Sequence, residues 1–424
     1  MEKNKVLISD SKEADIFVRQ LLNIGEAMYQ SGGEISRIED SLRRLGKVYG
    51  ALHVSVFALT SSIAITVEFP DNYSVAQNRR FTKREMIDSI KMEKLNQLCR
   101  ECAMQPLPVI ELREKVLDIL KEKPNEYRVY LGQLIAAMAF TVFFGGSIKD
   151  ACIAGFGAIL ICLMQKWVRP YCSAALFFHV IVSFVTGLFV DAANVFVPGL
   201  HVNQILIGDI MVLIPGAAIT NSIRYILSGD MVSSLEKLMD SLLQAFGIAT
   251  GFMLALLCVG GNYVDVTRTG TAWIILQLIA AAGGTLGFCL MYNLKTKYIW
   301  IPMIGGFLCW SIYLLLQALG TNAFVSALAA AFAVGVYGEI FARIVKVPTT
   351  LLFMPACIPL IPGGHLYYSA LAVLASEWSV FEAHLVLLIQ CAVGIAVGLA
   401  IVVELEKLIL KISETKKQQR GKNK

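Results

Sequence analysis

The residues best suited to chemistry in this chain lie around two proline-glycine breaks in apolar sequence. The tetrapeptide Leu-Ile-Pro-Gly occurs at 213–216 and again at 360–363, each time inside a long apolar segment. Proline removes a backbone donor and frees the carbonyl four residues earlier, which is that of Met211 or Ile358. Membranes tolerate such breaks mainly where they lie in protein or line a cavity, so two equivalent breaks point to a transporter's binding site.

Each break supplies groups that recognise charge. The free N–H groups of a new half-helix favour an anion such as a carboxylate, whereas the freed carbonyls favour an ammonium or a cation. An amino acid carries a carboxylate and an ammonium group, whereas a dicarboxylate carries carboxylates only. For Thr220 and Ser369, bonding to backbone groups freed by the kink is an alternative role. The predicted substrate contacts are Pro215, Gly216, Thr220 and Asn221 at the first break and Pro362, Gly363, Gly364, His365 and Tyr368 at the second.

Two acidic residues in apolar segments are candidates for proton coupling. Asp209 lies six residues before Pro215, about 9 Å along a helix. An ionisable residue inside a membrane is a functional hypothesis by default, as a proton carrier or as a contact for an ammonium. The alternative is that Asp209 forms a structural pair with a residue of another helix, or that it lies at the membrane boundary near the outer surface. Glu339 lies four residues before Arg343, a spacing that favours an ion pair within one helix, so a structural role is the stronger interpretation there.

The composition is that of a membrane protein. The 424 residues are 56% hydrophobic and 16% charged, with a mean hydropathy of +0.63, whereas soluble domains are about 25% charged. The net charge of +5 forms no basic stripe, so nucleic acid is not an expected partner. The first twenty residues lack the apolar core of a signal peptide. Cys99 and Cys102 have the spacing of a redox or half-zinc motif, but nothing completes it, so we expect no metal and no cofactor.

Apolar runs long enough to cross a bilayer follow one another from Val129 almost to the end of the chain. Lys and Arg gather in alternate connections, at 166, 169, 224, 237, 295, 297, 343 and 346, whereas the opposite connections carry only Lys149 and Arg268. The positive-inside rule therefore places both termini in the cytoplasm. The ten predicted spans are 129–145, 148–165, 172–190, 204–226, 241–260, 272–292, 299–317, 322–342, 349–374 and 384–404.

The predicted fold is a polytopic α-helical membrane protein, with ten helices in two five-helix inverted repeats and a cytoplasmic α+β domain at the N-terminus. An odd number of spans in each half inverts the second half, and both breaks fall in the fourth span of their half. The alternative to an internal repeat is that a short apolar tetrapeptide recurs by chance in a chain rich in Leu and Ile. The predicted domains are 1–125 (cytoplasmic), 126–262 and 263–406 (membrane modules) and 407–424 (a basic cytoplasmic tail).

The predicted cytoplasmic domain begins with two helices, at 13–31 and 34–49, which are split at a glycine pair. Runs rich in Val, Ile, Thr and Phe then predict strands. Two amphipathic helices follow before Pro124. The predicted strands are 52–59, 61–69 and 73–81, and the later helices are 84–103 and 108–122.

The chain resembles the threonine/serine exporter family of bacterial membrane proteins over nearly its whole length. The matching motifs are Ser31-Gly-Gly-Glu34 with Arg37 and Glu39, Ile214-Pro-Gly216, Glu339 with Arg343, Lys346-Val-Pro348, and Ile358 to Gly364. The resemblance implies two modules, which are separate chains in some relatives and fused here. It also implies efflux driven by the proton gradient, with threonine and serine associated with fused relatives and dicarboxylates with split ones.

The sequence therefore predicts a transporter rather than an enzyme, which exports small amino acids such as threonine or serine across the bacterial cytoplasmic membrane by proton antiport. Its expected partners are the substrate, protons and the lipid bilayer, and it acts alone or as a homo-oligomer. Export of a dicarboxylate such as succinate is one alternative, and a passive channel is another. A receptor or enzyme acting through residues 1–125 is a further alternative, although that region offers only scattered Glu, Arg and His53.

Overall fold

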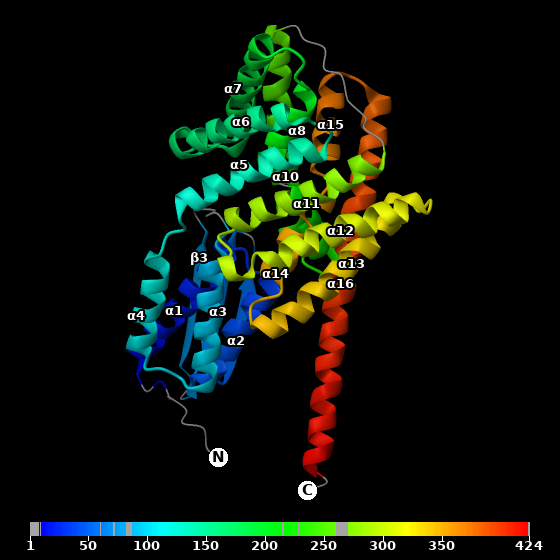
Figure 1. Cartoon of the computed structure of the whole chain (residues 1–424). Helices are drawn as coiled ribbons and strands as arrows, with labels where there is room; N and C mark the ends of the chain where they lie inside the picture. Colours follow the sequence, from blue (N-terminus) through cyan, green and yellow to red (C-terminus); the bar gives the residue numbers. More distant parts are fainter. Residues whose placement is uncertain are drawn as a thin grey trace. The chain divides into compact units, whose positions relative to one another are not determined.

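The computed structural model describes residues 8, 10–59, 61–70, 73–81, 87–213, 216–227, 229–259 and 270–422. Most of these residues are helical (Figure 1). The chain divides into two compact units, one of Met1–Val129 with Met291–Lys297 and the other of Tyr130–Leu290 with Tyr298–Lys424. A short segment from the second half of the chain thus belongs to the N-terminal unit.

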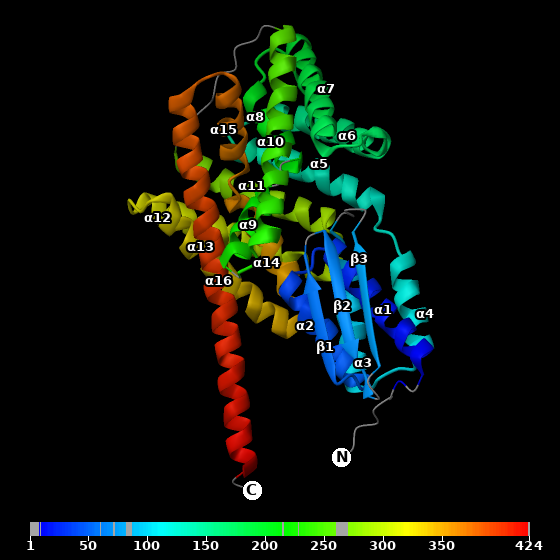
Figure 2. The same cartoon turned by 180° about the vertical axis from the view of Figure 1, so that it is seen from behind.

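The N-terminal unit contains a three-stranded antiparallel sheet of β1 (His53–Ala58), β2 (Ser62–Glu68) and β3 (Ser74–Arg80), in that order. The three predicted strands are therefore confirmed. β1 and β2 pair from His53 opposite Glu68 to Ala58 opposite Ile63. Because strand side chains alternate between faces, the apolar ones gather on one face, which α1 and α2 contact (Figure 2). The buried strand residues are Val54, Val56, Ala58, Ile63, Ile65, Val67 and Val75.

Four helices complete this unit: α1 (Ser11–Gln30), α2 (Ile35–Val48), α3 (Ser89–Met104) and α4 (Val109–Lys121). Their apolar faces meet in a core where Phe17 stacks on Tyr49 with ring centroids 4.4 Å apart. The Tyr49 hydroxyl donates to the carbonyl of Leu107 at 2.8 Å. The core thus joins the first helices to the connection before α4.

The glycine pair between α1 and α2 has a structural role. Gly32 has a φ of +93°, which is a left-handed conformation that suits glycine. The N–H of Gly33 donates to the carbonyl of Met28 at 2.8 Å and closes the end of α1. Farther on, Glu39 accepts from the backbone N–H of Ala58 and from Arg43. These residues of the family motif therefore organise the domain's fold.

The second unit is entirely helical in the residues described. Seven helices are long and apolar enough to cross a membrane, and a bent pair makes an eighth candidate. The chain is thus a polytopic helical membrane protein with seven or eight candidate spans among these residues. The helices are α5 (Glu126–Phe143), α6 (Ile148–Trp167), α7 (Ala175–Phe196), α8 (Val202–Leu213), α9 (Gly216–Leu227), α10 (Met231–Val259), α11 (Thr271–Met291), α12 (Trp300–Ala318), α13 (Ala323–Val345), α14 (Thr350–Ala356), α15 (Gly363–Leu374) and α16 (Trp378–Lys422).

Close helix packing in this unit uses small residues. Gly394 and Gly398 of α16 face α13, where an added Cβ would lie 2.6 Å from the carbonyl oxygens of Phe324 and Leu328 respectively. Glycines four residues apart let two membrane helices approach closely without a hydrophobic driving force. α16 itself continues as a helix to Lys422, beyond the end of its apolar portion at Glu406.

Candidate functional site

The second tetrapeptide coincides with an interruption between helices. At the first, α8 ends at Leu213 and α9 begins at Gly216, while Ile214 and the predicted contact Pro215 lie outside the described residues. At the second, α14 is followed by a 3-10 turn, η4 (Ile358–Leu360), and then by α15. The chain bends there by 43°.

The second break is closed by local hydrogen bonds. Pro362 has φ −78° and ψ 47°, and the N–H of Gly363 donates to the carbonyl of Ile361 at 2.7 Å, which makes a tight γ-type turn. The Ile358 carbonyl, expected to be free, accepts from the N–H of Ile361 at 3.0 Å. That prediction was wrong because the chain compensates for the proline with a 3-10 turn. An added Cβ on Gly364 would lie 3.7 Å from the Phe144 ring, so this glycine has room beside it.

Asp209 lies in α8 and is completely buried. Gly157 of α6 faces it so closely that a side chain there would collide with the carboxylate. Neither carboxylate oxygen has a hydrogen-bond partner among the described residues. A buried ionised carboxylate without a partner is strongly unfavourable, so this group holds a proton or meets a cation. Asp209 is therefore the polar group of this unit that most needs a functional explanation.

The helices α8 and α15 pack against each other. Ile205 and Ile210 of α8 and Tyr367 and Ala370 of α15 belong to one buried cluster. Phe252 of α10 joins the same cluster and meets Tyr367 edge to face, with centroids 6.1 Å apart. Segments more than 140 residues apart in the sequence are thus brought together in one cluster.

A histidine pair lies just after the second break. The Nδ1 atoms of His365 on α15 and His384 on α16 are 3.0 Å apart. Tyr368 stacks on His384 at 4.9 Å with an interplanar angle of 22°. One Nδ1 must donate and the other accept, so the pair is held by a single shared proton. The sequence prediction missed His384, although an ionisable residue at the edge of a predicted span was the available signal.

The remaining predicted contacts differ in their roles. Thr220 is buried and Asn221 half-buried on α9, which packs against α10 and α16. The Ser369 hydroxyl donates to the carbonyl of His365 at 2.8 Å, which lies within α15 and is not one of the carbonyls expected to be freed by the kink. Beside it, an apolar cavity of about 210 Å³ lies between α10, α15 and α16. Its apolar lining does not suit a zwitterion.

Glu339 is fully engaged in structural contacts. Its Oε1 accepts from Arg343 Nε at 2.7 Å, and its Oε2 accepts from the Thr349 hydroxyl at 2.6 Å. Thr349 precedes α14, so Glu339 ties the end of α13 to the start of the second broken segment. The geometry favours the structural interpretation over proton coupling at this position.

Another buried carboxylate was not singled out from the sequence. Asp150 lies 2.8 Å from His201 Nδ1 and accepts from the backbone N–H groups of His201 and Ser147. These bonds connect the start of α6 to the start of α8. Unlike Asp209, Asp150 has all its acceptors in use, which indicates a structural role.

The cysteine pair of the N-terminal unit is buried and reduced. Burial raises the pKa of the Cys99 thiol to about 12 and also raises the pKa of Cys102. Burial thus favours the protonated form of both thiols.

Comparison with known proteins identifies the class. The family model described as "Putative threonine/serine exporter" matches residues 19–258. A second model, "Threonine/Serine exporter, ThrE", matches residues 277–404. The chain belongs to the threonine/serine exporter family, which confirms the resemblance seen in its motifs.

Two relatives show how distant the similarity is. The "Threonine/serine exporter" of Corynebacterium glutamicum is 22% identical over 394 residues, which cover 89% of this chain and 80% of that protein. The "Probable threonine/serine exporter" of Mycobacterium tuberculosis is 20% identical over 367 residues, 82% of this chain and 69% of that protein. No solved structure matches the chain.

Proposed function

We propose that this chain exports small amino acids such as threonine and serine across the bacterial cytoplasmic membrane by proton antiport. The family and the names of the two relatives support the substrate class. The observation that carries the mechanism is Asp209, because a completely buried carboxylate without a partner suits a group that alternately binds a proton and a substrate ammonium.

The proposed site lies where the two interrupted segments meet. At the second break, the first turn of α15 would offer backbone N–H groups to the substrate carboxylate. Asp209 favours the ammonium or the proton, and Gly216, Gly363 and Gly364 let the substrate approach the backbone closely. Tyr368 and the His365–His384 pair add polar groups to the second break. A dicarboxylate would use the N–H groups but would be repelled by ionised Asp209.

The helix pattern supports ten spans arranged as two inverted repeats. Each of the ten predicted ranges coincides with a helix or with a pair of helices, and the α8–α9 and α14–α15 pairs are the fourth of each half. Two contacts fit the proposed orientation with cytoplasmic termini. Segment 291–297, expected inside, packs in the N-terminal unit, and Asp150 and His201 join two connections expected outside.

The test is counterflow in proteoliposomes loaded with unlabelled threonine, serine or succinate. Wild type is compared with Asp209→Asn and, as a matched control, with Asp191→Asn, because Asp191 is a buried aspartate of α7 that has interactions with its neighbours. We expect exchange of threonine or serine. In Asp209→Asn, the response of this exchange to an imposed pH gradient should be at least about tenfold smaller than in wild type. The control should keep its response.

Each other result has a clear meaning. Exchange of succinate alone would make the dicarboxylate alternative correct. A response to the pH gradient in Asp209→Asn equal to that of wild type would show that Asp209 is not the proton-coupling residue. Flux without any dependence on the pH gradient would indicate a passive channel, and no exchange of any of the three compounds would reject the transport proposal.

A further inference from the structure

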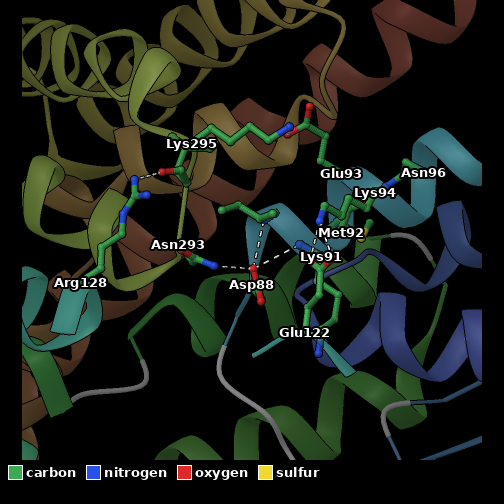
Figure 3. Close-up of polar contacts among 12 residues, drawn as sticks. Asp88, Lys91, Met92, Glu93, Lys94, Asn96, Glu122, Arg128, Asn293 and Lys295 are labelled. Atoms are coloured by element: carbon green, nitrogen blue, oxygen red, sulfur yellow. Dashed lines mark hydrogen bonds and ion pairs between the residues drawn. The ribbon is translucent and has the colours of Figure 1, made fainter. Parts of the chain in front are cut away.

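The connection between α11 and α12 contains a segment, Met291–Lys297, that is part of the N-terminal unit. Figure 3 shows its polar contacts with the start of α3 and with Arg128. We call these contacts the clamp. The clamp consists of Asp88, Ser89, Glu93 and Arg128 on one side and Tyr292, Asn293, Leu294 and Lys295 on the other.

Asp88 is the centre of the clamp. It caps α3, where its Oδ1 accepts from the N–H groups of Ile90 at 3.1 Å and Lys91 at 3.2 Å. The same oxygen accepts from Asn293 Nδ2 at 2.9 Å, across 205 residues of sequence. Next to it, the N–H of Ser89 donates to the Tyr292 carbonyl at 2.9 Å. Side-chain and backbone bonds thus fix the segment at the start of one helix.

Asn293 fits this position for two independent reasons. It has a φ of +52°, in the left-handed region that residues other than glycine seldom adopt but that asparagine tolerates. This conformation turns the chain after the end of α11. Its side chain is 6% exposed and bonded to Asp88. One residue therefore ends a helix and anchors the connection to the N-terminal unit.

Two charged contacts complete the clamp. Lys295 Nζ lies 2.9 Å from Glu93 Oε2, and the Glu93 side chain is only 13% exposed. Partial burial reduces the screening that makes surface ion pairs weak. Arg128 Nη2 donates to the carbonyl of Leu294. Two charged side chains of other segments, Glu93 and Arg128, therefore hold the stretch of seven residues.

The clamp joins regions matched by different family models. Asp88, Glu93 and Arg128 lie in the region 19–258, and Asn293 and Lys295 lie in the region 277–404. The clamped segment is also continuous with α11 at one end and with α12 at the other. A movement of the N-terminal unit therefore acts on two helices of the second module through a few residues of chain.

We propose that the clamp docks the segment between α11 and α12 at the start of α3 and so couples the N-terminal unit to these two helices. We also propose that transport requires the contacts of the clamp to be intact. The transport part rests on the proposed exporter function. Coupling of this kind follows from a physical connection that holds two elements in one arrangement. The charges of Glu93 and Lys295 make it testable without removing a core side chain.

The experiment reverses the charges one at a time and then together, in the full chain. Glu93→Lys and Lys295→Glu each place like charges side by side, whereas the double variant restores an opposite pair. Lys94→Glu is the matched control, because Lys94 is the next residue of α3 but pairs with Glu122 at 2.5 Å, away from the segment. Hydrogen exchange of 289–299 in detergent reports docking, and threonine or serine counterflow reports transport.

We expect each single variant to speed hydrogen exchange in the segment and to lower counterflow by about fivefold or more. The double variant should recover most of the wild-type protection from hydrogen exchange and most of the counterflow. Lys94→Glu should change neither hydrogen exchange nor counterflow. Asn293→Gly is a second probe, because it keeps the left-handed backbone while losing the bond to Asp88, and it should also speed exchange.

Two results would overturn the proposal. Unchanged hydrogen exchange in both single variants and in Asn293→Gly would show that these contacts do not hold the segment. Faster exchange with counterflow equal to wild type would show that docking is not coupled to transport. If wild type itself moves no substrate, the exporter function fails, while the hydrogen-exchange measurement still decides whether the clamp exists.

Discussion

Asp88 and Asp209 are both buried aspartates, yet their surroundings are opposite. Asp88, in the N-terminal unit, accepts hydrogen bonds from two backbone N–H groups and from Asn293. Asp209, in α8, has no partner for either carboxylate oxygen among the described residues. Burial without partners is unfavourable for a charge and persists only where something else requires it. The comparison teaches that the partners of a buried acid, rather than its burial, separate a structural role from a functional one.

The membrane environment alone does not explain the difference. Glu339 in α13 and Asp150 in α6 lie in helices of the same unit as Asp209, and both have their oxygens engaged. These two acidic residues of the same unit are therefore satisfied by hydrogen bonds. Asp209 stands apart from them, which strengthens the case for a role in transport.

The largest expected effect on stability is that of replacing Asp88 by alanine, and the same substitution at Asp209 provides the comparison. Asp88→Ala removes the cap of α3 and leaves buried N–H groups unpaired, so it should destabilise the N-terminal unit by about 2–3 kcal/mol. Asp209→Ala breaks no hydrogen bond and should change stability by less than about 1 kcal/mol. Hydrogen exchange of α3 and of α8 in each variant, compared with wild type, measures both effects. An equal loss at the two sites would contradict the comparison.

Glu339→Gln extends the test to a membrane helix with a paired acid. The glutamine loses the charge that holds Arg343 and weakens the acceptor of the Thr349 hydroxyl, so thermal stability in detergent should fall by about 1 kcal/mol. The response of counterflow to a pH gradient should remain, because we propose that Asp209, and not Glu339, binds the proton. Loss of that response at unchanged stability would return Glu339 to the proton pathway.

The smallest effect concerns a buried group that titrates in the N-terminal unit. The pKa of Cys99 is about 12 in the folded protein and near 9 when the thiol is solvated. Folding therefore favours the protonated thiol, and its contribution is complete below pH 9 and lost as the pH rises to 12. Between pH 8 and 10.5, the unfolding midpoint in denaturant should fall more in wild type than in Cys99→Ala. The exposed Cys152, changed to Ala, is the control, and equal slopes in all three proteins would refute the assignment.

Local features of the sequence predicted the helices and strands well because periodicity and apolar runs act over neighbouring residues. The element ends were less accurate. α10 begins at Met231 rather than at 241, since its charged first turns hide a helix from a search for apolar spans. α16 likewise continues past its apolar portion, because hydropathy marks where a span ends and not where the helix does.

The candidate site was predictable only in part. The second tetrapeptide located the interruption before α15, and Asp209 was recognisable as an acid in an apolar run. The sequence could not show that Asp209 lacks partners, that His384 faces His365, or that Ile358 uses its carbonyl in a turn. Each of these depends on which atoms come into contact, and a hydrogen bond needs a specific distance and direction.

The sequence by itself determined the membrane class, the family and the helix interruption at 360–363, because insertion into lipid and helix breaking depend on residues close together in the chain. Only the tertiary structure decided that α8 and α15 pack together, that Glu339 and Asp150 are paired while Asp209 is not, and that segment 291–297 belongs to the N-terminal unit. These outcomes depend on contacts between residues separated by up to about two hundred positions, and no local pattern encodes such pairs.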